Sequence, residues 1–502
     1  MGNHLYDALF GRHEGRDADF LILPDGGRVS HAAFADRAAR FAGALVAMGL
    51  GSGDRVALQL EKSPDMLAVI AGAIRAGVVF LPLNTAYTPA EVAYFVGDAG
   101  AKLLLCDGRA EATLAPVAAK AGAQLAVLNA DGTGSFAEAA AMAVPVPVVE
   151  RNADDLAALL YTSGTTGRSK GAMMSHANLL SNAEVLVDYW RFTDQDVLLH
   201  ALPIFHTHGL FVATNVALLA GARMIFLPKF DASEVIRHLP QATTMMGVPT
   251  FYTRLLDDPR LTRDLAARMR LFISGSAPLL AETHRQWQTR TGHVILERYG
   301  MTETNMNTSN PYEGDRRAGT VGFPLPGVEV KVCDASGVDL PAGEIGTIEL
   351  RGPNVFQGYW NMPEKTAEEL RSDGFFITGD LGMVDADGYV TIVGRGKDLI
   401  ISGGFNIYPK EVELVLDALP GVLESAVIGA PHPDFGEAVV AVVVPEPDAL
   451  LDPQAIRAAL GQSLAKFKQP KHIAFRDTLP RNTMGKVQKA ALREDFKGIF
   501  AP

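Results

Sequence analysis

The residues from Tyr161 to Gly171 have the composition of a loop that could bind several phosphate groups. They read Tyr-Thr-Ser-Gly-Thr-Thr-Gly-Arg-Ser-Lys-Gly and directly follow the apolar run LAALL. Glycines let backbone N–H groups turn toward one point, while hydroxyls and a lysine add further donors. The segment is not a Walker A loop, and alone it could equally be a surface loop. The residues predicted to bind phosphate are Thr162, Ser163, Gly164, Thr165, Thr166, Gly167 and Lys170.

Six further motifs follow this loop along the chain. They are PIFHTHG at 203–209, SGSAPL at 274–279, YGMTET at 299–304, TGD at 378–380, GRGKDLIISGGFNIYPKEVE at 394–413 and PRNTMGKVQK at 480–489. With the loop, they resemble the adenylate-forming superfamily, which contains acyl-CoA synthetases, adenylation domains of peptide synthetases and luciferases. One departure is Ser169, where many members have proline. The resemblance covers nearly the whole chain and implies an enzyme that activates a carboxylate with ATP.

The resemblance implies that YGMTET contributes to an ATP and magnesium site. Tyr299 offers a flat face to adenine, and Thr302 offers a hydroxyl to phosphate. Glu303 and Thr166 would hold Mg²⁺, which prefers hard oxygen ligands. Outside this motif, a lone glutamate would more often be an ordinary surface carboxylate.

The same resemblance assigns the ribose and the space around adenine. Asp380 would accept bonds from both ribose hydroxyls, with Arg395 assisting at the ribose or phosphate. A Gly-Asp pair such as 379–380 is also frequent in turns, which is the plain alternative. Gly275 and Ala277 are small enough to let adenine and the acyl group approach the backbone.

Two reaction steps are implied, and each needs different groups. Carboxylate and MgATP would first give an acyl-adenylate and pyrophosphate, and the thiol of coenzyme A would then displace AMP. The resemblance gives Lys486 the adenylation step and places the hinge between the steps at Lys397. Gly403, Gly404 and Phe405 would line the path of the thiol. A lysine acetyltransferase acting on Lys486 would silence the first step by removing its charge.

The acyl-binding residues resemble those of malonyl-CoA synthetases. The similar segments are GVPTFYTRLL at 247–256, LFISGSAPLL at 271–280 and ERYGMTETNMNTSNP at 297–311. In that subgroup, residues matching Arg254 and Ser276 hold the distal carboxylate, and those matching Thr207 and Met306 limit the pocket. His206 would lie beside the acyl group. Methylmalonate, one methyl group larger than malonate, would be discriminated by only about 1–3 kcal/mol.

Several alternatives stay open from the sequence. Arg254 could be a helix-surface arginine, and the acid could then be another short-chain or an aryl carboxylate. His200, His206 and His208 could suggest a metal site, but carboxylate or cysteine partners form no recognisable set with them. A nucleotide-binding regulator without turnover is disfavoured because it would not need the adenylation lysine.

The elements that must position these residues alternate between strands and helices. RVALQLE, VVFLPL, KLLLCD and QLAVLNA read as strands, and a helix is expected around Met66–Gly77. Four further runs are also expected to form strands: LAALLY, VLLHALP, RMIFLPK and RLFISGS. This alternation predicts an α/β fold with largely parallel, buried sheets. After Tyr312, runs such as VEVKVCD, GTIELRG and YVTIVGR, separated by turn residues, predict antiparallel hairpins.

The predicted organisation is a large N-terminal domain and a small mobile one. Residues 1–394 would contain layered α/β subdomains and a β-rich subdomain that bind ATP and the acyl group. Residues 395–397 would be the hinge, and 398–502 an α+β domain with helices at Lys410–Leu419 and Pro453–Lys466.

The composition excludes several classes of protein. Of 502 residues, 48% are hydrophobic and 20% charged, which is incompatible with a mainly disordered chain. The formal net charge is −12, and no dense block of Lys and Arg predicts nucleic-acid or membrane binding. Two cysteines and the lack of a signal peptide or membrane span favour a cytoplasmic protein.

Overall fold

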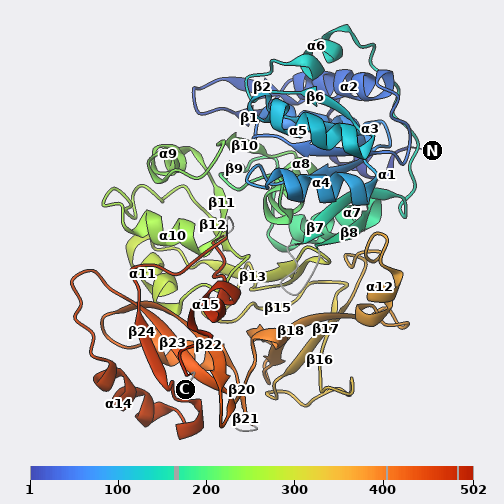
Figure 1. Ribbon diagram of the computed structural model, residues 1–502. Helices are drawn as coiled ribbons and strands as arrows, with labels where there is room; N and C mark the ends of the chain where they lie inside the picture. Colours follow the sequence, from blue (N-terminus) through green and yellow to red (C-terminus); the bar gives the residue numbers. More distant parts are fainter. Residues whose placement is uncertain (1, 163–168, 403–404, 483–484, 501–502) are drawn as a thin grey trace.

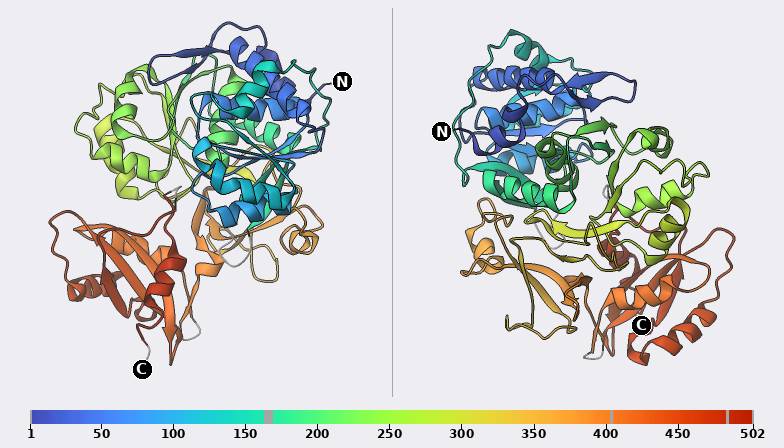
Figure 2. Two further views of the ribbon diagram at one scale, coloured as in Figure 1. Left: turned by 45° about the horizontal axis from the view of Figure 1, so that its top comes forward. Right: turned by 180° about the vertical axis from the view of Figure 1, so that it is seen from behind.

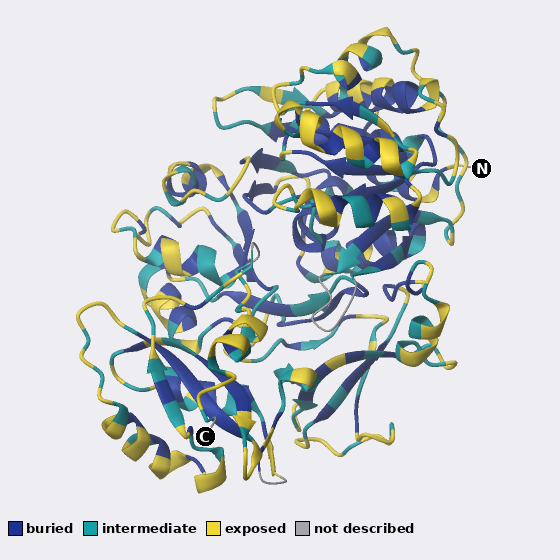
Figure 3. Ribbon diagram, viewed as in Figure 1, coloured by how far each residue is buried: buried dark blue, intermediate teal, exposed yellow. Residues whose placement is uncertain are grey.

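The computed structural model of the chain describes residues 2–162, 169–402, 405–482 and 485–500. Figure 1 shows a mixed α/β molecule in which helices and sheets of the N-terminal half lie above two smaller β-containing parts. This confirms the predicted fold class. Strand interiors are buried while helices such as α14 (Pro453–Ser463) are exposed along their outer faces, as Figure 3 shows.

The first sheet is built from the strands that the apolar runs predict. In the described residues its order is β6 (Gln124–Val127), β5 (Leu103–Cys106), β3 (Arg55–Gln59), β4 (Val79–Pro82), β7 (Leu156–Thr162) and β8 (Lys170–Ser175). All neighbours are parallel except β7 and β8. The helix expected around 66–77 is α3 (Pro64–Arg75); it begins two residues earlier because the Ser63 side chain caps it.

The second sheet carries most of the site motifs at its edge. Its order in the described chain is β15 (Phe323–Pro324), β14 (Asn305–Ser309), β13 (Leu296–Met301), β12 (Leu271–Ser274), β11 (Thr244–Gly247), β9 (Val197–His200), β10 (Arg223–Phe226), β1 (Asp19–Ile22) and β2 (Arg28–Ser30). The six neighbouring strands β13, β12, β11, β9, β10 and β1 are parallel to one another. Their carboxyl ends therefore meet at one edge, where ligands bind in open α/β sheets.

Helices cover these two sheets and connect their strands. In the first half they are α1 (His4–Leu9), η1 (Gly11–His13), α2 (His31–Ala47), α4 (Pro89–Ala99), α5 (Gly108–Ala121), α6 (Ser135–Met142) and α7 (His176–Tyr189). Around the second sheet they are η2 (His208–Thr214), α8 (Asn215–Ala220), α9 (Ala232–His238), η3 (Leu239–Gln241), α10 (Pro249–Leu256) and α11 (Ala281–Thr291). No helix in the described ranges is long and apolar enough to cross a membrane.

Two β-rich parts complete the molecule. The antiparallel sheet has the order β16 (Glu329–Cys333), β17 (Gly346–Arg351), β18 (Phe376–Val384) and β19 (Val390–Arg395), with α12 (Pro363–Glu369) beside it. The last sheet contains β21 (Phe405–Ile407), β20 (Ile400–Ser402), β23 (Gly436–Pro445), β22 (Val422–His432) and β24 (His472–Phe475). The short helix η4 (Gly396–Asp398) connects the two parts. The helices of the last part are α13 (Pro409–Asp417), α14, η5 (Lys466–Lys468) and α15 (Lys489–Phe496). In both views of Figure 2 this C-terminal part lies below the green segments around α10 and α11.

Candidate active site

Asp380 is held by two neighbours where β18 meets β13. Its carboxylate accepts a 2.5 Å hydrogen bond from the Tyr299 hydroxyl and forms an ion pair with Arg395, whose Nε lies 2.7 Å away. Asp380 lies opposite Arg395 in the β18–β19 ladder, so it is a strand residue, and the turn interpretation of TGD is wrong. The pKa of Tyr299 is raised far above its usual value, mainly by burial and next by the nearby charge of Asp380. The Tyr299 hydroxyl therefore keeps its proton and remains a hydrogen-bond donor. The carboxylate is thus fixed in place, with lone pairs left for a sugar hydroxyl.

Glu303 lies in a group of polar side chains between β13 and α12. The Tyr359 hydroxyl lies 3.1 Å from Glu303 Oε1 and 2.6 Å from Glu369 Oε2. Lys170 Nζ lies 3.1 Å from both carboxylate oxygens of Glu369 and 4.1 Å from the centroid of the Tyr359 ring. The lysine predicted to bind phosphate therefore has a protein counter-ion in the structure.

The environment of Glu303 fits a cation. Its side chain is buried and has no ion pair in the described part of the chain, and burial raises its pKa. A buried carboxylate without a cation is costly, so Mg²⁺ accompanying ATP would offset that cost here. Thr302 lies next to it, partly buried, in the turn between β13 and β14. Thr166 lies outside the described residues, as do Ser163, Gly164, Thr165 and Gly167; Thr162 is described and its hydroxyl lies 3.5 Å from the Lys170 carbonyl.

Lys486 lies near residues of the N-terminal part although it belongs to the C-terminal part. Its pKa is lowered, first by desolvation and then by Arg395, while Asp380 opposes the shift. Lys486 as a whole is nevertheless exposed to solvent. Desolvation, followed by the charges of Arg298 and Lys486, lowers the pKa of His206 to about 4. His206 is therefore neutral at physiological pH and lies close to the lysine.

Arg298 is a site residue that the sequence interpretation missed. It lies within β13, is only 4% exposed, and its Nε and Nη2 atoms have no hydrogen-bond partner in the described part of the protein. Burial lowers the pKa of Arg298 to about 9. A Cβ atom on Gly275 would overlap with the guanidinium group, so the absence of a side chain at 275 makes room for this cation. The signal available in the sequence was a charged residue directly before YGMTET, in the strand that continues into this motif.

A serine and a histidine lie on the same side of the site. His208 Nδ1 lies 3.2 Å from Ser276 Oγ, and the buried His208 Nε2 has no partner among the described residues. Ser276 has a φ of +72°, a conformation that is unfavourable for a residue with a side chain. Such strain is typical of functional positions. Thr207 Oγ1, buried and without a described partner, belongs to the same segment.

Met306 and the small residues shape the space between these groups. The Met306 side chain is 2% exposed and packs so closely against Gly300 that a Cβ atom there would overlap with it. Ala277 follows Ser276 in the loop after β12 and is half-buried. Ser276, Arg298 and Met306 therefore lie on, or directly after, the three neighbouring strands β12, β13 and β14.

Arg254 has a different environment from Arg298. It lies in the last turn of α10, is exposed, and has no hydrogen bond or ion pair in the described ranges. Its proposed contact with an acid stays a prediction. Lys397 lies in η4, and its carbonyl accepts a 3.1 Å hydrogen bond from Arg493.

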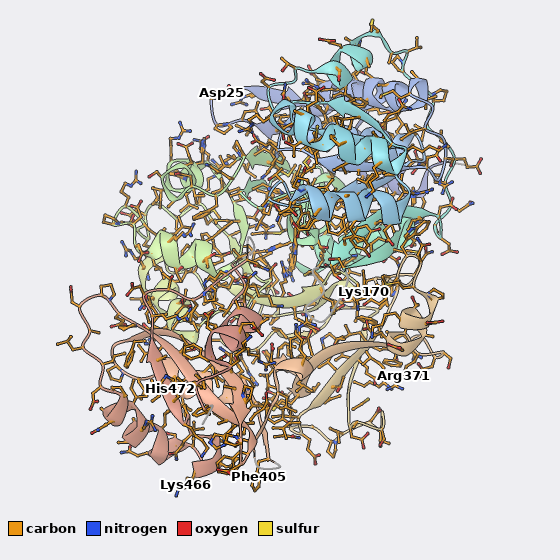
Figure 4. The ribbon with its side chains drawn as sticks, in the orientation of Figure 1. Asp25, Lys170, Arg371, Phe405, Lys466 and His472 are labelled. Carbon is orange, nitrogen blue, oxygen red and sulfur yellow. The ribbon has the colours of Figure 1, made fainter. Side chains whose placement is uncertain are left out.

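Phe405 is the described residue of the segment predicted to line the thiol path. Its side chain is 54% exposed and stacks on Phe467 with ring centroids 4.5 Å apart. Figure 4 shows it at the lower edge of the C-terminal part, well away from Lys170 in this orientation. Gly403 and Gly404 lie outside the described residues.

Comparisons with known proteins agree with this arrangement. Residues 11–360 match the AMP-binding enzyme family, and residues 411–486 match the C-terminal domain of AMP-binding enzymes. Malonate–CoA ligase from Arabidopsis thaliana is 35% identical over 485 residues, which cover 89% of this chain and 79% of that protein. ATP-bound MatB from Rhodopseudomonas palustris is 58% identical, with a TM-score of 0.98 and full coverage of both chains. Apo MatB superimposes with a TM-score of 0.87. The chain belongs to the AMP-binding enzyme family.

Proposed function

We propose that this enzyme joins malonate to coenzyme A with ATP, through a malonyl-adenylate, and releases AMP and pyrophosphate. The observation that carries the choice of acid is the buried guanidinium of Arg298, which has two nitrogen atoms without partners. A free carboxylate at the far end of a diacid would give it charge-assisted hydrogen bonds. The similarity to a malonate–CoA ligase and to MatB supports the same substrate.

The polar groups near Arg298 favour a short diacid over a monocarboxylic acid. Ser276 Oγ and His208 Nε2 are further polar atoms that can contact the distal carboxylate. Arg254, exposed at the end of α10, is proposed as a second cation at the same carboxylate. Acetate or benzoate would leave the guanidinium buried and unpaired, which is costly. Methylmalonate is expected to react as well, because its additional methyl group changes the affinity only modestly.

The first step forms a bond between a carboxylate oxygen of malonate and the α-phosphorus of ATP, and pyrophosphate leaves. Lys486 would place its positive charge beside the reacting groups, where negative charge accumulates in the transition state. Asp380 would hold the ribose, and Tyr299 would contact adenine. Glu303 and Thr166 are proposed to hold Mg²⁺, which neutralises charge on the phosphates when it is bound. Lys170, with Thr162, Ser163, Gly164, Thr165 and Gly167, would bind the phosphates once it leaves Glu369.

The second step forms the thioester bond between the sulfur of coenzyme A and the malonyl carbonyl carbon, and AMP leaves. His206, which is neutral at physiological pH, would lie beside the acyl group and contact it. Rotation about Lys397 is proposed to exchange Lys486 for the segment Gly403–Phe405. Acetylation of Lys486 would abolish the first step, because it removes the ammonium charge. The arrangement in which Lys486 approaches Arg395 suits the first step.

A panel of acids tests the proposed function. Malonate, methylmalonate, succinate, acetate and benzoate are assayed for thioester formation that depends on ATP and coenzyme A. We expect malonate to give the highest kcat/KM, methylmalonate to follow, and both monocarboxylic acids to be poor substrates. Benzoate or acetate used as efficiently as malonate would refute the assignment of the acid.

A further inference from the structure

Lys62 and His200 form a contact that none of the roles above explains. Lys62 follows β3 of the first sheet, and His200 is the last residue of β9 in the second. Lys62 Nζ lies 2.8 Å from His200 Nδ1 and 2.8 Å from the His200 carbonyl oxygen. This side chain therefore joins the two sheets at the carboxyl ends of their strands.

The environment of Lys62 is unusual for a lysine. No carboxylate lies within ion-pair distance of it in the described part of the chain, and its ammonium nitrogen lies 4.3 Å from the centroid of the Phe226 ring. Desolvation lowers its pKa far below the usual value. Whether charged or neutral, the amine keeps hydrogens that it can donate to His200.

The second ring nitrogen of His200 identifies its tautomer. His200 Nε2 lies 2.9 Å from the Gly209 carbonyl oxygen, and a carbonyl can only accept a hydrogen bond. Nε2 must therefore carry the proton, and Nδ1 is left as the acceptor for Lys62. Thr214 Oγ1 donates a further 2.9 Å bond to the same carbonyl. The ring is 1% exposed, so water does not replace either contact.

Gly209 connects this contact to the acyl site. It is the second residue of η2, a π-helix that begins at His208, and π-helices often occur at functional sites. A Cβ atom on Gly209 would overlap with the Pro203 carbonyl, so this turn is tightly packed. The preceding residue, His208, contacts Ser276. Gly209 and His208 share a peptide bond, so a fixed Gly209 carbonyl limits how far the backbone that carries the His208 ring can move.

We propose that Lys62 is a positioning residue for the acyl pocket. It keeps His200 in the Nε2–H tautomer, which holds Gly209 and so orients His208 toward Ser276 and the distal carboxylate. The identity of the acid in this proposal rests on the proposed function; the tautomer and its dependence on Lys62 do not.

Steady-state kinetics of Lys62→Met test the consequence for the acid. Methionine keeps an unbranched apolar stem but cannot donate. We expect the KM for malonate to rise about tenfold, as for the loss of one buried hydrogen bond, and the KM for ATP to change less than twofold. Lys62→Arg, which keeps a donor, should recover part of the loss, and the exposed Lys120→Met serves as control. Equal changes in both KM values, or no change, would overturn the proposal.

Nitrogen-15 NMR of histidine-labelled wild-type enzyme tests the tautomer without any substrate. The His200 signals are assigned with His200→Gln. The proposal requires Nε2–H in the wild type and a mixture of tautomers in Lys62→Met. Nδ1–H or a charged ring in the wild type would overturn it, even if the variants fail to fold. A wild-type enzyme that makes no malonyl-CoA, yet shows the expected tautomer, would refute the proposed function alone.

Discussion

At the scale of single residues, Arg298 carries an energetic cost in the free enzyme. A buried guanidinium with two unpartnered nitrogen atoms destabilises the folded state. This cost is acceptable if a substrate carboxylate offsets it on binding. A site adapted to a ligand rather than to stability explains why β13 contains a buried arginine.

Replacing this arginine should therefore stabilise the ligand-free protein. Arg298→Met keeps most of the volume and removes the unpaired charge, so we expect the free energy of unfolding to increase by about 1–3 kcal/mol. Urea denaturation in the absence of substrates measures it. The exposed Arg254→Met is the control and should change stability by less than about 0.5 kcal/mol. A clear loss of stability in Arg298→Met would show that the guanidinium has partners in the folded protein.

Lys486 makes a prediction about pH. Desolvation and Arg395 lower its pKa, so its ammonium group loses its proton at a lower pH than an ordinary lysine does. The adenylation step needs the charged form, and its rate should fall as the pH rises through this lowered pKa. Single-turnover formation of the adenylate measures the profile. In Lys486→Arg the alkaline decrease should disappear, at a lower overall rate; an unchanged profile would contradict the role of Lys486.

The residue roles could be predicted only in part. Tyr299, Glu303, Asp380 and Lys486 stand in motifs, and the structure brings Asp380 into contact with Tyr299 and places Lys486 near it. Arg298 was missed because a sequence shows that a residue is charged but not that its partners are absent. For Arg254 the structure shows an exposed side chain and leaves its role a prediction.

At the scale of elements, the loop after β12 places Ser276 by a strained backbone. Its φ of +72° costs little for glycine and more for alanine. Ser276→Gly and Ser276→Ala both remove the hydroxyl, so each should raise the KM for malonate by about tenfold. Only the stability should differ, with the alanine variant about 1 kcal/mol less stable than the glycine variant. Thermal unfolding and malonate kinetics of both variants test this; a KM close to that of the wild type in both would exclude the hydroxyl contact.

The strands were predictable at this scale, and the irregular segments were not. Apolar runs such as RVALQLE and VVFLPL correspond to β3 and β4, because buried parallel strands require continuous apolar sequence. The π-helix η2 has no periodic signal in the sequence, and its Gly209 is in contact with His200 and Pro203, which lie earlier in the chain. The β13–β14 hairpin at YGMTET was also missed, because polar site residues occupy its turn.

At the scale of the whole molecule, η4 connects the antiparallel sheet to the C-terminal part. The Arg493 guanidinium donates to the Lys397 carbonyl and lies 3.8 Å from Asp398, so α15 contacts this connection directly. The proposed hinge at 395–397 thus begins at the last residue of β19 and lies before β20.

Fixing this connection should separate the two steps. Proline at position 397 fits the helical turn of η4 but restricts the φ change that a rotation needs. Lys397→Pro should retain exchange of pyrophosphate into ATP within about threefold of the wild type and lose at least about tenfold in thioester formation. Lys397→Ala serves as control for loss of the side chain. Equal losses in both reactions would contradict a hinge at this residue.

The most direct measurement of the central claim is the ratio of kcat/KM for malonate to that for acetate, in the wild type and in Arg298→Met. The cation at Arg298 should make this ratio large in the wild type, and its removal should lower the ratio by about 10–100-fold through loss of charge-assisted hydrogen bonds. The effect should come from malonate, with acetate unchanged or improved. If the ratio is the same in Arg298→Met as in the wild type, this cation does not select the diacid.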